Sequence, residues 1–334
     1  MKKIGVIGAG SWGTALAITL AGKGHEVKIW DLDKEHLHSL REKRENVRYL
    51  PGIRFPEGMQ VVETDEEALA GVDVALFSAP AQHFRAAFKS ALPYIPDEAV
   101  IVNVAKGIEK GSLMRMSEIA FEIDPKARYV VLSGPSHAEE VGRLLPTTVA
   151  VGSRDRALAE YVQDVFMTDR FRVYTSDDIV GMELGGSLKN IIALGAGISD
   201  GMGFGDNAKA ALMTRGLVEI KRLGVKLGAD PETLSGLSGV GDLIVTCTSM
   251  HSRNRRCGIM IGEGVDPKEA TRRVGMVVEG MSTTEAAYSL AQREGVEMPI
   301  TEAIYQIITG KITAAEAEPL LMGREKKHER DENL

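Results

Sequence analysis

The stretch Gly8-Ala9-Gly10-Ser11-Trp12-Gly13 decides the fold of this chain. It joins a β-branched run to a helical pattern, so its G-x-G-x-x-G spacing stands in a strand-to-helix turn. There Gly8 permits the tight bend, Gly10 lets a pyrophosphate approach the backbone, and Gly13 allows the helix to pack on the sheet. Free N–H groups at the helix start attract phosphate. The motif predicts a dinucleotide site, although a plain glycine turn can have the same spacing.

The first half of the chain alternates β-branched runs with helical patterns. The expected strands are Lys3 to Ile7, Glu26 to Trp30, Asp73 to Phe77, Val100 to Val104, Tyr129 to Leu132 and Thr147 to Gly152. The expected helices include Thr14 to Lys23, Gln82 to Leu92 and Leu113 to Glu122. Parallel strands need crossover connections, so this alternation predicts a doubly wound, mainly parallel sheet with helices on both faces, the α/β Rossmann architecture.

From about Asp178 onward the pattern is all-α. Long helical stretches rich in small and apolar residues are Ile179 to Ala196, Lys209 to Leu227 and Thr283 to Glu294. We therefore expect a nucleotide-binding domain over residues 1–177 and an all-helical substrate domain over residues 178–323. The final residues, 324–334, are almost all charged or polar and are expected to fray.

Composition excludes several classes of protein. The chain has 334 residues, 44% of them hydrophobic, and a formal charge of −7, which gives it no electrostatic footprint for nucleic acid or an anionic membrane. Two cysteines form neither a disulfide framework nor a metal-ligand set, so we expect no metal and a reducing compartment. The N-terminus imitates a signal peptide, but glycines interrupt its apolar run, and no apolar run is long enough to span a membrane. A cytoplasmic location is expected.

Two further segments stand where strands of this sheet are expected to end. Asp31 closes the second strand about 20 residues after the glycine motif, where an acid accepts hydrogen bonds from the adenosine ribose; a plain surface acid is the alternative. Leu132 to Glu139 forms another strand-to-helix turn, in which Ser136 and Glu139 have capping-box spacing. Because the carboxyl ends of parallel strands line the ligand crevice, the same turn could also contact a ligand.

Of two lysines that stand out by position, one is a candidate for proton chemistry. Lys106 follows an expected strand at the same sheet edge, where a solvated lysine is the ordinary interpretation. Helical spacing places Lys189 on one face with the small residues Gly181, Gly185, Ala193 and Gly197. A lysine pressed among small residues loses water, which lowers its pKa toward the range where it exchanges a proton. The alternative is a helix-packing stripe with a lysine that reaches solvent at its margin.

Two polar clusters follow in the helical part. Asp242 comes after the turn Gly239-Val240-Gly241, with Thr246 one helical turn later, and Asp242 could simply be an N-cap. The run Ser252-Arg253-Asn254-Arg255-Arg256 concentrates three guanidinium groups. Such a run is usually a solvated face, but in an acidic, nucleotide-binding protein it also suits a small phosphate, which arginine binds bidentately.

These segments together resemble the bacterial NAD(P)-dependent glycerol-3-phosphate dehydrogenases over nearly the whole chain. Besides the glycine motif, the matching segments are Tyr49-Leu50-Pro51-Gly52, Lys106-Gly107, Ser133-Gly134-Pro135-Ser136, Lys189-Asn190, Gly205-Asp206-Asn207, Gly239-Val240-Gly241-Asp242, Ser252-Arg253-Asn254 and Val278-Glu279-Gly280. The resemblance implies a Rossmann domain followed by a helical domain, and a cytoplasmic homodimer. The implied reaction interconverts dihydroxyacetone phosphate and sn-glycerol 3-phosphate for phospholipid synthesis.

The resemblance also implies roles for single residues. Lys189 accepts the proton in alcohol oxidation, Lys106 contacts substrate and cofactor and stabilises oxygen charge, and Asp242 orients a lysine or a hydroxyl. The further substrate contacts that it implies are Gly134, Ser136, Asn190, Thr246, Ser252, Arg253 and Asn254. To the three glycines of the motif and Asp31 it adds the cofactor positions Ser11, Trp12, Lys106, Ala138, Arg253, Val277 and Glu279.

One position departs from the family pattern. Members that use NADPH often carry Arg or His where this chain has Leu32, which follows Asp31. An acid at the ribose repels a 2′-phosphate, so we expect NAD or NADP as cofactor with NADH favoured. Two rival functions are a hydroxyacid dehydrogenase of the 6-phosphogluconate type and a non-catalytic nucleotide sensor. The segments Lys189-Asn190 and Ser252-Arg253-Asn254 argue against the first rival, and the intact catalytic-type residues argue against the second.

Overall fold

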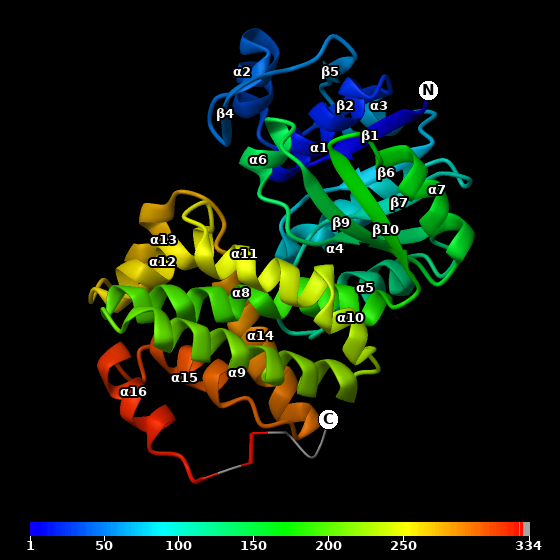
Figure 1. The fold of residues 1–334 in the computed structure, drawn as a ribbon. Helices are drawn as coiled ribbons and strands as arrows, with labels where there is room; N and C mark the ends of the chain where they lie inside the picture. Colours follow the sequence, from blue (N-terminus) through cyan, green and yellow to red (C-terminus); the bar gives the residue numbers. More distant parts are fainter. Residues whose placement is uncertain (327, 330–334) are drawn as a thin grey trace. The chain divides into compact units, whose positions relative to one another are not determined.

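The computed structural model describes residues 1–326 and 328–329 and divides into two compact units (Figure 1). The sheet unit contains Met1–Ala105 and Met116–Ile179. The helical unit contains Lys106–Arg115 and the described residues from Val180 onward. The expected tail, residues 324–334, lies partly outside the described residues. By contacts, therefore, a short segment from the first half of the chain groups with the helices.

The sheet unit is built on an eight-stranded sheet in the order β10-β9-β8-β7-β6-β1-β2-β5. The strands are β1 (Lys3–Ile7), β2 (Glu26–Trp30), β5 (Met59–Val61), β6 (Val74–Phe77), β7 (Val100–Asn103), β8 (Tyr129–Ser133), β9 (Thr147–Gly152) and β10 (Phe171–Ser176). Every pair of neighbours is parallel except β8 and β9, which are antiparallel. The prediction of a mainly parallel sheet is confirmed. A separate small antiparallel pair joins β3 (Glu45–Asn46) to β4 (Leu50–Arg54).

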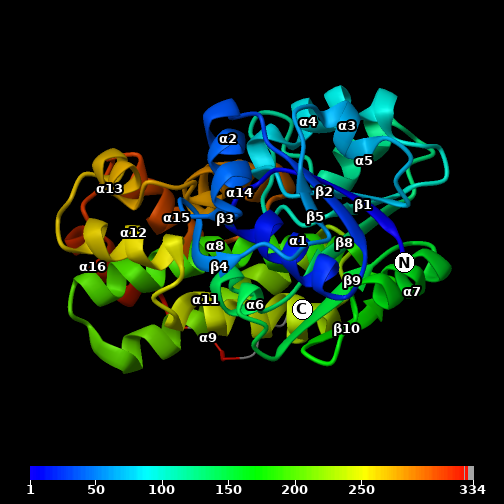
Figure 2. The same ribbon diagram turned by 90° about the horizontal axis from the view of Figure 1, so that it is seen from above.

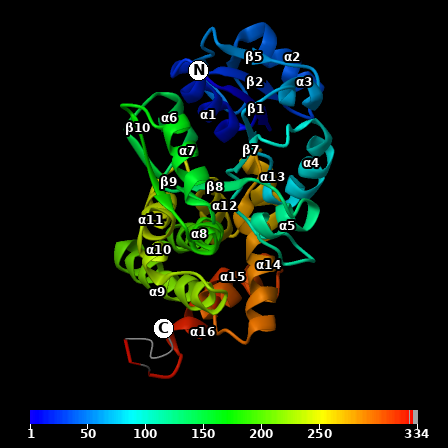
Figure 3. The same ribbon diagram turned by 90° about the vertical axis from the view of Figure 1, so that its right-hand side faces the viewer.

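Helices cover both faces of this sheet, as expected for a doubly wound fold. Figures 2 and 3 show α1 (Ser11–Gly22), α6 (Ala138–Gly142) and α7 (Arg156–Phe166) on one face. The same views show α3 (Asp65–Leu69), α4 (Phe84–Ala91) and α5 (Met116–Ile123) on the other. The remaining helical elements of this unit are α2 (Lys34–Lys43), η1 (Ala81–His83) and η2 (Leu92–Tyr94). Residues such as Val6, Leu16 and Ile29 fill the core between sheet and helices.

One predicted helix begins later than expected. The pattern Leu113 to Glu122 predicts a helix from Leu113, but α5 begins at Met116. Gly111 and Leu113 both have positive φ angles, +83° and +60°, which a right-handed helix does not accept. The first three residues of that prediction are therefore wrong, because the backbone turns there.

The helical unit is arranged around α8 (Ile179–Gly201), which Figure 3 shows nearly along its axis. The surrounding elements are α9 (Gly205–Lys226), α10 (Pro231–Ser235), η3 (Leu237–Gly241), α11 (Asp242–Thr248), α12 (Arg253–Gly262), α13 (Pro267–Val274), α14 (Glu279–Glu294), α15 (Pro299–Ile308) and α16 (Ala314–Met322). Nearly every residue of α8 is buried. The prediction of long helices beyond residue 178 is confirmed. Within the described part of the chain, none of the helices has the length and hydropathy needed to cross a bilayer.

The glycines of α8 let neighbouring segments approach closely. A Cβ atom on Gly185 would lie 2.6 Å from the Ser238 carbonyl oxygen in η3, and one on Gly197 would lie 2.1 Å from the Arg255 carbonyl oxygen in α12. Both distances are shorter than real Cβ contacts. The stripe of small residues is therefore a helix-packing face, and it sets how closely η3 and α12 lie against α8.

Candidate active site

Lys189 lies in the buried helix α8 and is bonded to α11. Its Nζ donates to Asp242 Oδ1 at 2.5 Å and to Thr246 Oγ1 at 2.7 Å. The Thr246 hydroxyl in turn donates to the backbone oxygen of Asp242 at 2.6 Å, one turn earlier in α11. Lys189 is 6% exposed and Asp242 is 1% exposed. Lys189 is thus a buried, paired lysine rather than one that reaches solvent, and Asp242 is not the N-cap of α11 but its first residue, after the N-cap Gly241.

Lys106 completes this cluster from the segment that follows β7. Its Nζ donates to Asp242 Oδ2 at 2.6 Å. The two oxygens of one carboxylate therefore hold two ammonium groups, with the Lys106 side chain 16% exposed and that of Lys189 8% exposed. Although these residues are far apart in the sequence, all three belong to the helical unit. We call Lys106, Lys189, Asp242 and Thr246 the lysine cluster.

The electrostatics of the cluster prepare Lys189 for proton exchange. Burial lowers the pKa of Lys189 to about 8, an effect that the attraction of Asp242 opposes and the nearby ammonium of Lys106 reinforces. Burial also acts to raise the pKa of Asp242, but the two ammonium groups outweigh it and hold that pKa below its usual value. The neighbouring Cys247 is buried, and its pKa rises to about 12, so its thiol stays neutral. The result is an ionised carboxylate beside a lysine that titrates near neutral pH.

A chain of amides fixes the surroundings of the cluster. Asn190 Nδ2 donates to the Lys106 carbonyl oxygen at 3.3 Å, and Asn254 Nδ2 donates to Asn190 Oδ1 at 2.9 Å. Asn254 Oδ1 then accepts the Gly280 N–H at 2.8 Å. A Cβ atom on Gly280 would lie 2.7 Å from the Asn190 carbonyl oxygen, so this close approach requires glycine. The predicted site residues Asn190 and Asn254 are therefore joined to the lysine cluster.

The basic run divides into arginines with different roles. Ser252 is the N-cap of α12, and its hydroxyl accepts the Arg255 N–H at 3.2 Å. The Arg255 guanidinium binds Asp200 Oδ2 at 2.8 Å and the Thr248 carbonyl oxygen at 2.7 Å, so it ties α12 to α8 and α11. Arg255 therefore has a structural role within the helical unit. Arg253 is half-buried at the start of α12, directly before Asn254.

The glycine turn of the sheet unit has the predicted geometry. Gly8 adopts a φ of +104°, and a Cβ atom on Gly13 would lie 2.1 Å from the Gly8 carbonyl oxygen. At Gly10, by contrast, a Cβ atom would meet nothing within 4 Å. Gly10 is the N-cap of α1 without a side-chain capping bond, and Ser11 follows it as the first helical residue. Among the described residues the buried indole N–H of Trp12 has no hydrogen-bond partner. This open, donor-rich turn fits a pyrophosphate.

Asp31 braces that turn from the end of β2. Its Oδ2 accepts the Ala9 N–H at 2.7 Å and its Oδ1 accepts the Asp33 N–H at 3.1 Å. Leu32 beside it is 83% exposed. Leucine has no charge, so it does not supply the cation that Arg or His would place at this position. Arg48 lies nearby, where its guanidinium pairs with Asp33 at 3.1 Å. The Asp31 carboxylate thus holds the backbone of the glycine turn in place.

The second strand-to-helix turn is not a capping box. Helix α6 begins at Ala138, and its N-cap is His137, which makes no side-chain capping bond. The Ser136 hydroxyl instead donates to the Gly134 carbonyl oxygen at 2.9 Å, because Ser136 precedes the cap by one residue. Gly134 has a φ of +143°, which favours glycine. The capping-box prediction for Ser136 and Glu139 is wrong, while Gly134, Ser136 and Ala138 do lie together at the end of β8.

The last two predicted cofactor positions precede and open α14 in the helical unit. Val277 is exposed, and Glu279 is the first residue of α14, after the N-cap Val278. The next residue, Gly280, is the one that Asn254 holds. The loop before α14 is thereby connected to the amide chain of the lysine cluster.

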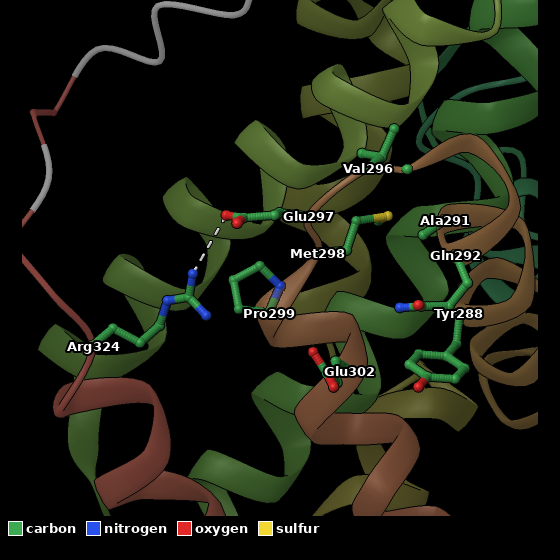
Figure 4. Close-up of a pocket in the computed structure, with 10 residues that line it drawn as sticks. Tyr288, Ala291, Gln292, Val296, Glu297, Met298, Pro299, Glu302 and Arg324 are labelled. Atoms are coloured by element: carbon green, nitrogen blue, oxygen red, sulfur yellow. Dashed lines mark ion pairs between the residues drawn. The ribbon is translucent and has the colours of Figure 1, made fainter.

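A separate cavity of about 280 Å³ lies elsewhere in the helical unit (Figure 4). Tyr288, Met298, Glu302 and Arg324 line it, and Arg324 pairs with Glu297 at 3.5 Å. None of the predicted site residues contributes to this cavity.

Sequence reasoning missed a buried ion pair next to the cluster. Arg115 Nη1 donates to Glu183 Oε2 at 2.8 Å, with the side chains 11% and 3% exposed. A glutamate in the mainly apolar helix that carries Lys189 was a signal for a buried partner. The identity of that partner had no signal, because it is 68 residues away.

Comparisons with known proteins agree with this geometry. Residues 3–159 match the family model of the NAD-dependent glycerol-3-phosphate dehydrogenase N-terminus, and residues 178–318 match that of the C-terminus. The chain is 54% identical over 333 residues to a glycerol-3-phosphate dehydrogenase (NAD(P)+) of Pelotomaculum thermopropionicum, covering 99% of this chain and 95% of the relative. It is 50% identical to the Bacillus subtilis protein of the same name, covering 99% of this chain and 97% of that relative.

A solved structure shows the same fold. The crystal structure of glycerol-3-phosphate dehydrogenase from Coxiella burnetii matches with a TM-score of 0.93 and 40% identity, covering 97% of this chain and 99% of that one. Matches of both family models and of full-length relatives, together with the lysine cluster and the glycine turn, leave one assignment. The chain belongs to the family of NAD-dependent glycerol-3-phosphate dehydrogenases.

Proposed function

We propose that this protein is an NAD(P)-dependent sn-glycerol-3-phosphate dehydrogenase, an oxidoreductase that interconverts dihydroxyacetone phosphate and sn-glycerol 3-phosphate. The observation that carries the proposal is the buried Lys189, whose pKa of about 8 lets it hold or release a proton near neutral pH. A lysine at its ordinary pKa would stay protonated and could act only as an acid. Family membership supplies the substrate and the cofactor class.

The lysine cluster moves the proton of the reaction. In reduction Lys189 donates a proton to the C2 oxygen of dihydroxyacetone phosphate, and in oxidation it accepts the proton of the C2 hydroxyl. Asp242 stays ionised between the two ammonium groups and orients both of them. The Lys106 side chain would lie beside the same oxygen and stabilise the negative charge that develops there.

The glycine turn and the loop before α14 would hold the cofactor. When NAD(P) is bound, its nicotinamide accepts or supplies the hydride. The residues proposed to bind it are Gly8, Gly10, Ser11, Trp12, Gly13, Asp31, Lys106, Ala138, Arg253, Val277 and Glu279. The open space at Gly10 and the unpartnered Trp12 indole among the described residues support this choice.

The start of α12 would hold the phosphate end of the substrate. Arg253 provides charge-assisted hydrogen bonds, with Ser252 and Asn254 beside it. The remaining proposed substrate contacts are Gly134, Ser136, Asn190 and Thr246. Arg255 is committed to Asp200 and therefore shapes this site rather than binding the ligand.

The proposal also includes the domain roles, the oligomeric state and the cellular location that we expect from the sequence. We assign nucleotide binding to residues 1–177 and substrate binding to residues 178–323, in a homodimer that works in the cytoplasm and supplies glycerol 3-phosphate to phospholipid synthesis. Light scattering of the purified protein tests the dimer, because a single peak at the mass of one chain would contradict it.

A spectrophotometric assay of reduced-cofactor oxidation tests the proposed reaction. Purified protein should oxidise NADH or NADPH only when dihydroxyacetone phosphate is present. Activity with 6-phosphogluconate and an oxidised cofactor, but none with dihydroxyacetone phosphate, would instead support the hydroxyacid dehydrogenase. Cofactor binding without turnover of either substrate would support a nucleotide sensor.

A further inference from the structure

The segment Lys106–Arg115 is part of the helical unit although strand β7 precedes it and α5 of the sheet unit follows it. Its residue Ile108 is fully buried and belongs to the same apolar core as α8 residues such as Leu188 and Ile192. Lys106, at the start of this segment, is therefore positioned by the helices.

Both ends of the segment are fastened to α8. At its start the Lys106 carbonyl oxygen accepts from Asn190, and the Lys106 ammonium binds Asp242. At its end Arg115 forms the buried ion pair with Glu183. Glu183 precedes Lys189 on α8 by about 9 Å along the helix axis. One helix thus carries Lys189 and both anchors of the segment that carries Lys106.

We propose that Arg115 and Glu183 are positioning residues, whose buried ion pair anchors the 106–115 segment on α8 and so keeps the ammonium group of Lys106 on Asp242. The inference rests on the proposed function, in which Lys106 and Lys189 act on the same substrate oxygen. Removing one partner of a buried ion pair is unfavourable, because the other charge stays buried without its counter-charge in this pair. Removing both partners unfastens the segment without leaving a buried charge.

Loss of the anchor has a consequence that a general loss of stability does not share. The charged and titratable groups around Lys189 are Asp242 and Cys247 on α11 and Lys106 on the segment. If Lys106 leaves Asp242, its positive charge no longer repels that of Lys189, and the Asp242 carboxylate pairs with Lys189 alone. Both changes favour protonated Lys189 and raise its pKa. Because glycerol 3-phosphate oxidation needs neutral Lys189, the rising limb of kcat/KM moves to higher pH.

The experiment compares the double variant Arg115→Met/Glu183→Gln with wild type. We expect the rising limb, near pH 8 in wild type, to move up by roughly 0.5 to 1 pH unit and kcat at neutral pH to fall by roughly ten-fold. The single variant Arg115→Lys keeps the positive charge opposite Glu183 and should have the wild-type pH profile. The matched control is Lys110→Met/Glu285→Gln, which removes a half-exposed pair between the same segment and α14 and should leave the profile unchanged.

A second readout does not depend on activity. Acetylation of Lys106 by acetic anhydride, followed by mass spectrometry, should be several times faster in the double variant, because its amine is no longer held on Asp242. A folded double variant with wild-type acetylation or a wild-type pH profile overturns the inference. Wild-type protein inactive with dihydroxyacetone phosphate contradicts the proposed function instead, and the acetylation rates then decide the anchor on their own.

Discussion

The glycine turn of the sheet unit and the lysine cluster of the helical unit are built in opposite ways. The turn consists of six consecutive residues, and its geometry is a property of the backbone: Gly8 has a positive φ and Gly13 faces the Gly8 carbonyl. The cluster joins side chains that are 136 and 53 residues apart in the sequence, from three separate segments. A local turn can be identified from spacing alone, whereas the cluster exists only when the helical unit has folded.

The two regions also differ in what they ask of their residues. In the turn, glycines act by lacking a side chain, so a larger residue disturbs the site by its volume. In the cluster, buried charges act through one another, because the two ammonium groups hold the pKa of Asp242 below its usual value. Substitutions in the cluster are therefore expected to change chemistry first, while substitutions in the turn change packing or binding.

The largest expected effect is that of Lys189→Ala. Loss of a positioned proton donor should lower kcat by roughly 100- to 10,000-fold, while NADH binding, measured by fluorescence, stays nearly unchanged. The matched control is Ser187→Ala on the same helix, whose hydroxyl donates to the Glu183 carbonyl oxygen at 2.6 Å. Its kcat should remain within about two-fold of wild type. A Lys189→Ala protein with wild-type kcat would remove Lys189 from the proton transfer, and Lys106 would be tested next.

The next effect concerns the phosphate anchor. Arg253→Ala should cost about 1.5 to 3 kcal/mol, roughly 10- to 150-fold in kcat/KM for dihydroxyacetone phosphate, through lost charge-assisted hydrogen bonds. Dihydroxyacetone, which lacks the phosphate, should be a poor substrate and lose much less further activity in the variant. NADH affinity is measured separately and its change subtracted, because Arg253 is also proposed to contact the cofactor. Equal losses for both substrates after that correction would show that Arg253 is not the anchor.

A third prediction separates packing from binding within the glycine turn. Gly13→Ala places a Cβ atom 2.1 Å from a backbone oxygen, so it should lower the free energy of unfolding by about 1 to 3 kcal/mol. Gly10→Ala meets no atom within 4 Å and should keep the free energy of unfolding within about 0.5 kcal/mol, while weakening NADH binding. Urea unfolding and fluorescence titration measure the two quantities. Equal destabilisation by both substitutions would contradict this division of roles.

Much of the fold and part of the site could be predicted because their signals are local. Strand and helix periodicity predicted the mainly parallel sheet and the long helices. Strand β10 escaped notice because Arg172 and Tyr174 alternate with its buried residues at a sheet edge, which weakens the apolar signal. The Ser136 capping box failed because α6 begins one residue later than the spacing requires, so His137 rather than Ser136 is the N-cap. The partners of Lys189 and Glu183 could not be predicted, since they depend on packing between distant segments.

The smallest expected effect concerns cofactor preference. Measuring it tests whether the Asp31 carboxylate repels a 2′-phosphate in addition to bonding to the glycine turn. Since its carboxylate lies beside the exposed Leu32, we expect kcat/KM for NADH to exceed or roughly match that for NADPH at fixed salt. Arg48→Ala, which removes the cation paired with Asp33, should leave the ratio nearly unchanged if no 2′-phosphate site exists there. A strong NADPH preference that Arg48→Ala abolishes would contradict this expectation. It would show that Arg48 attracts the 2′-phosphate more strongly than Asp31 repels it. In that case the nucleotide site, like the lysine cluster, depends on a residue brought in by the fold.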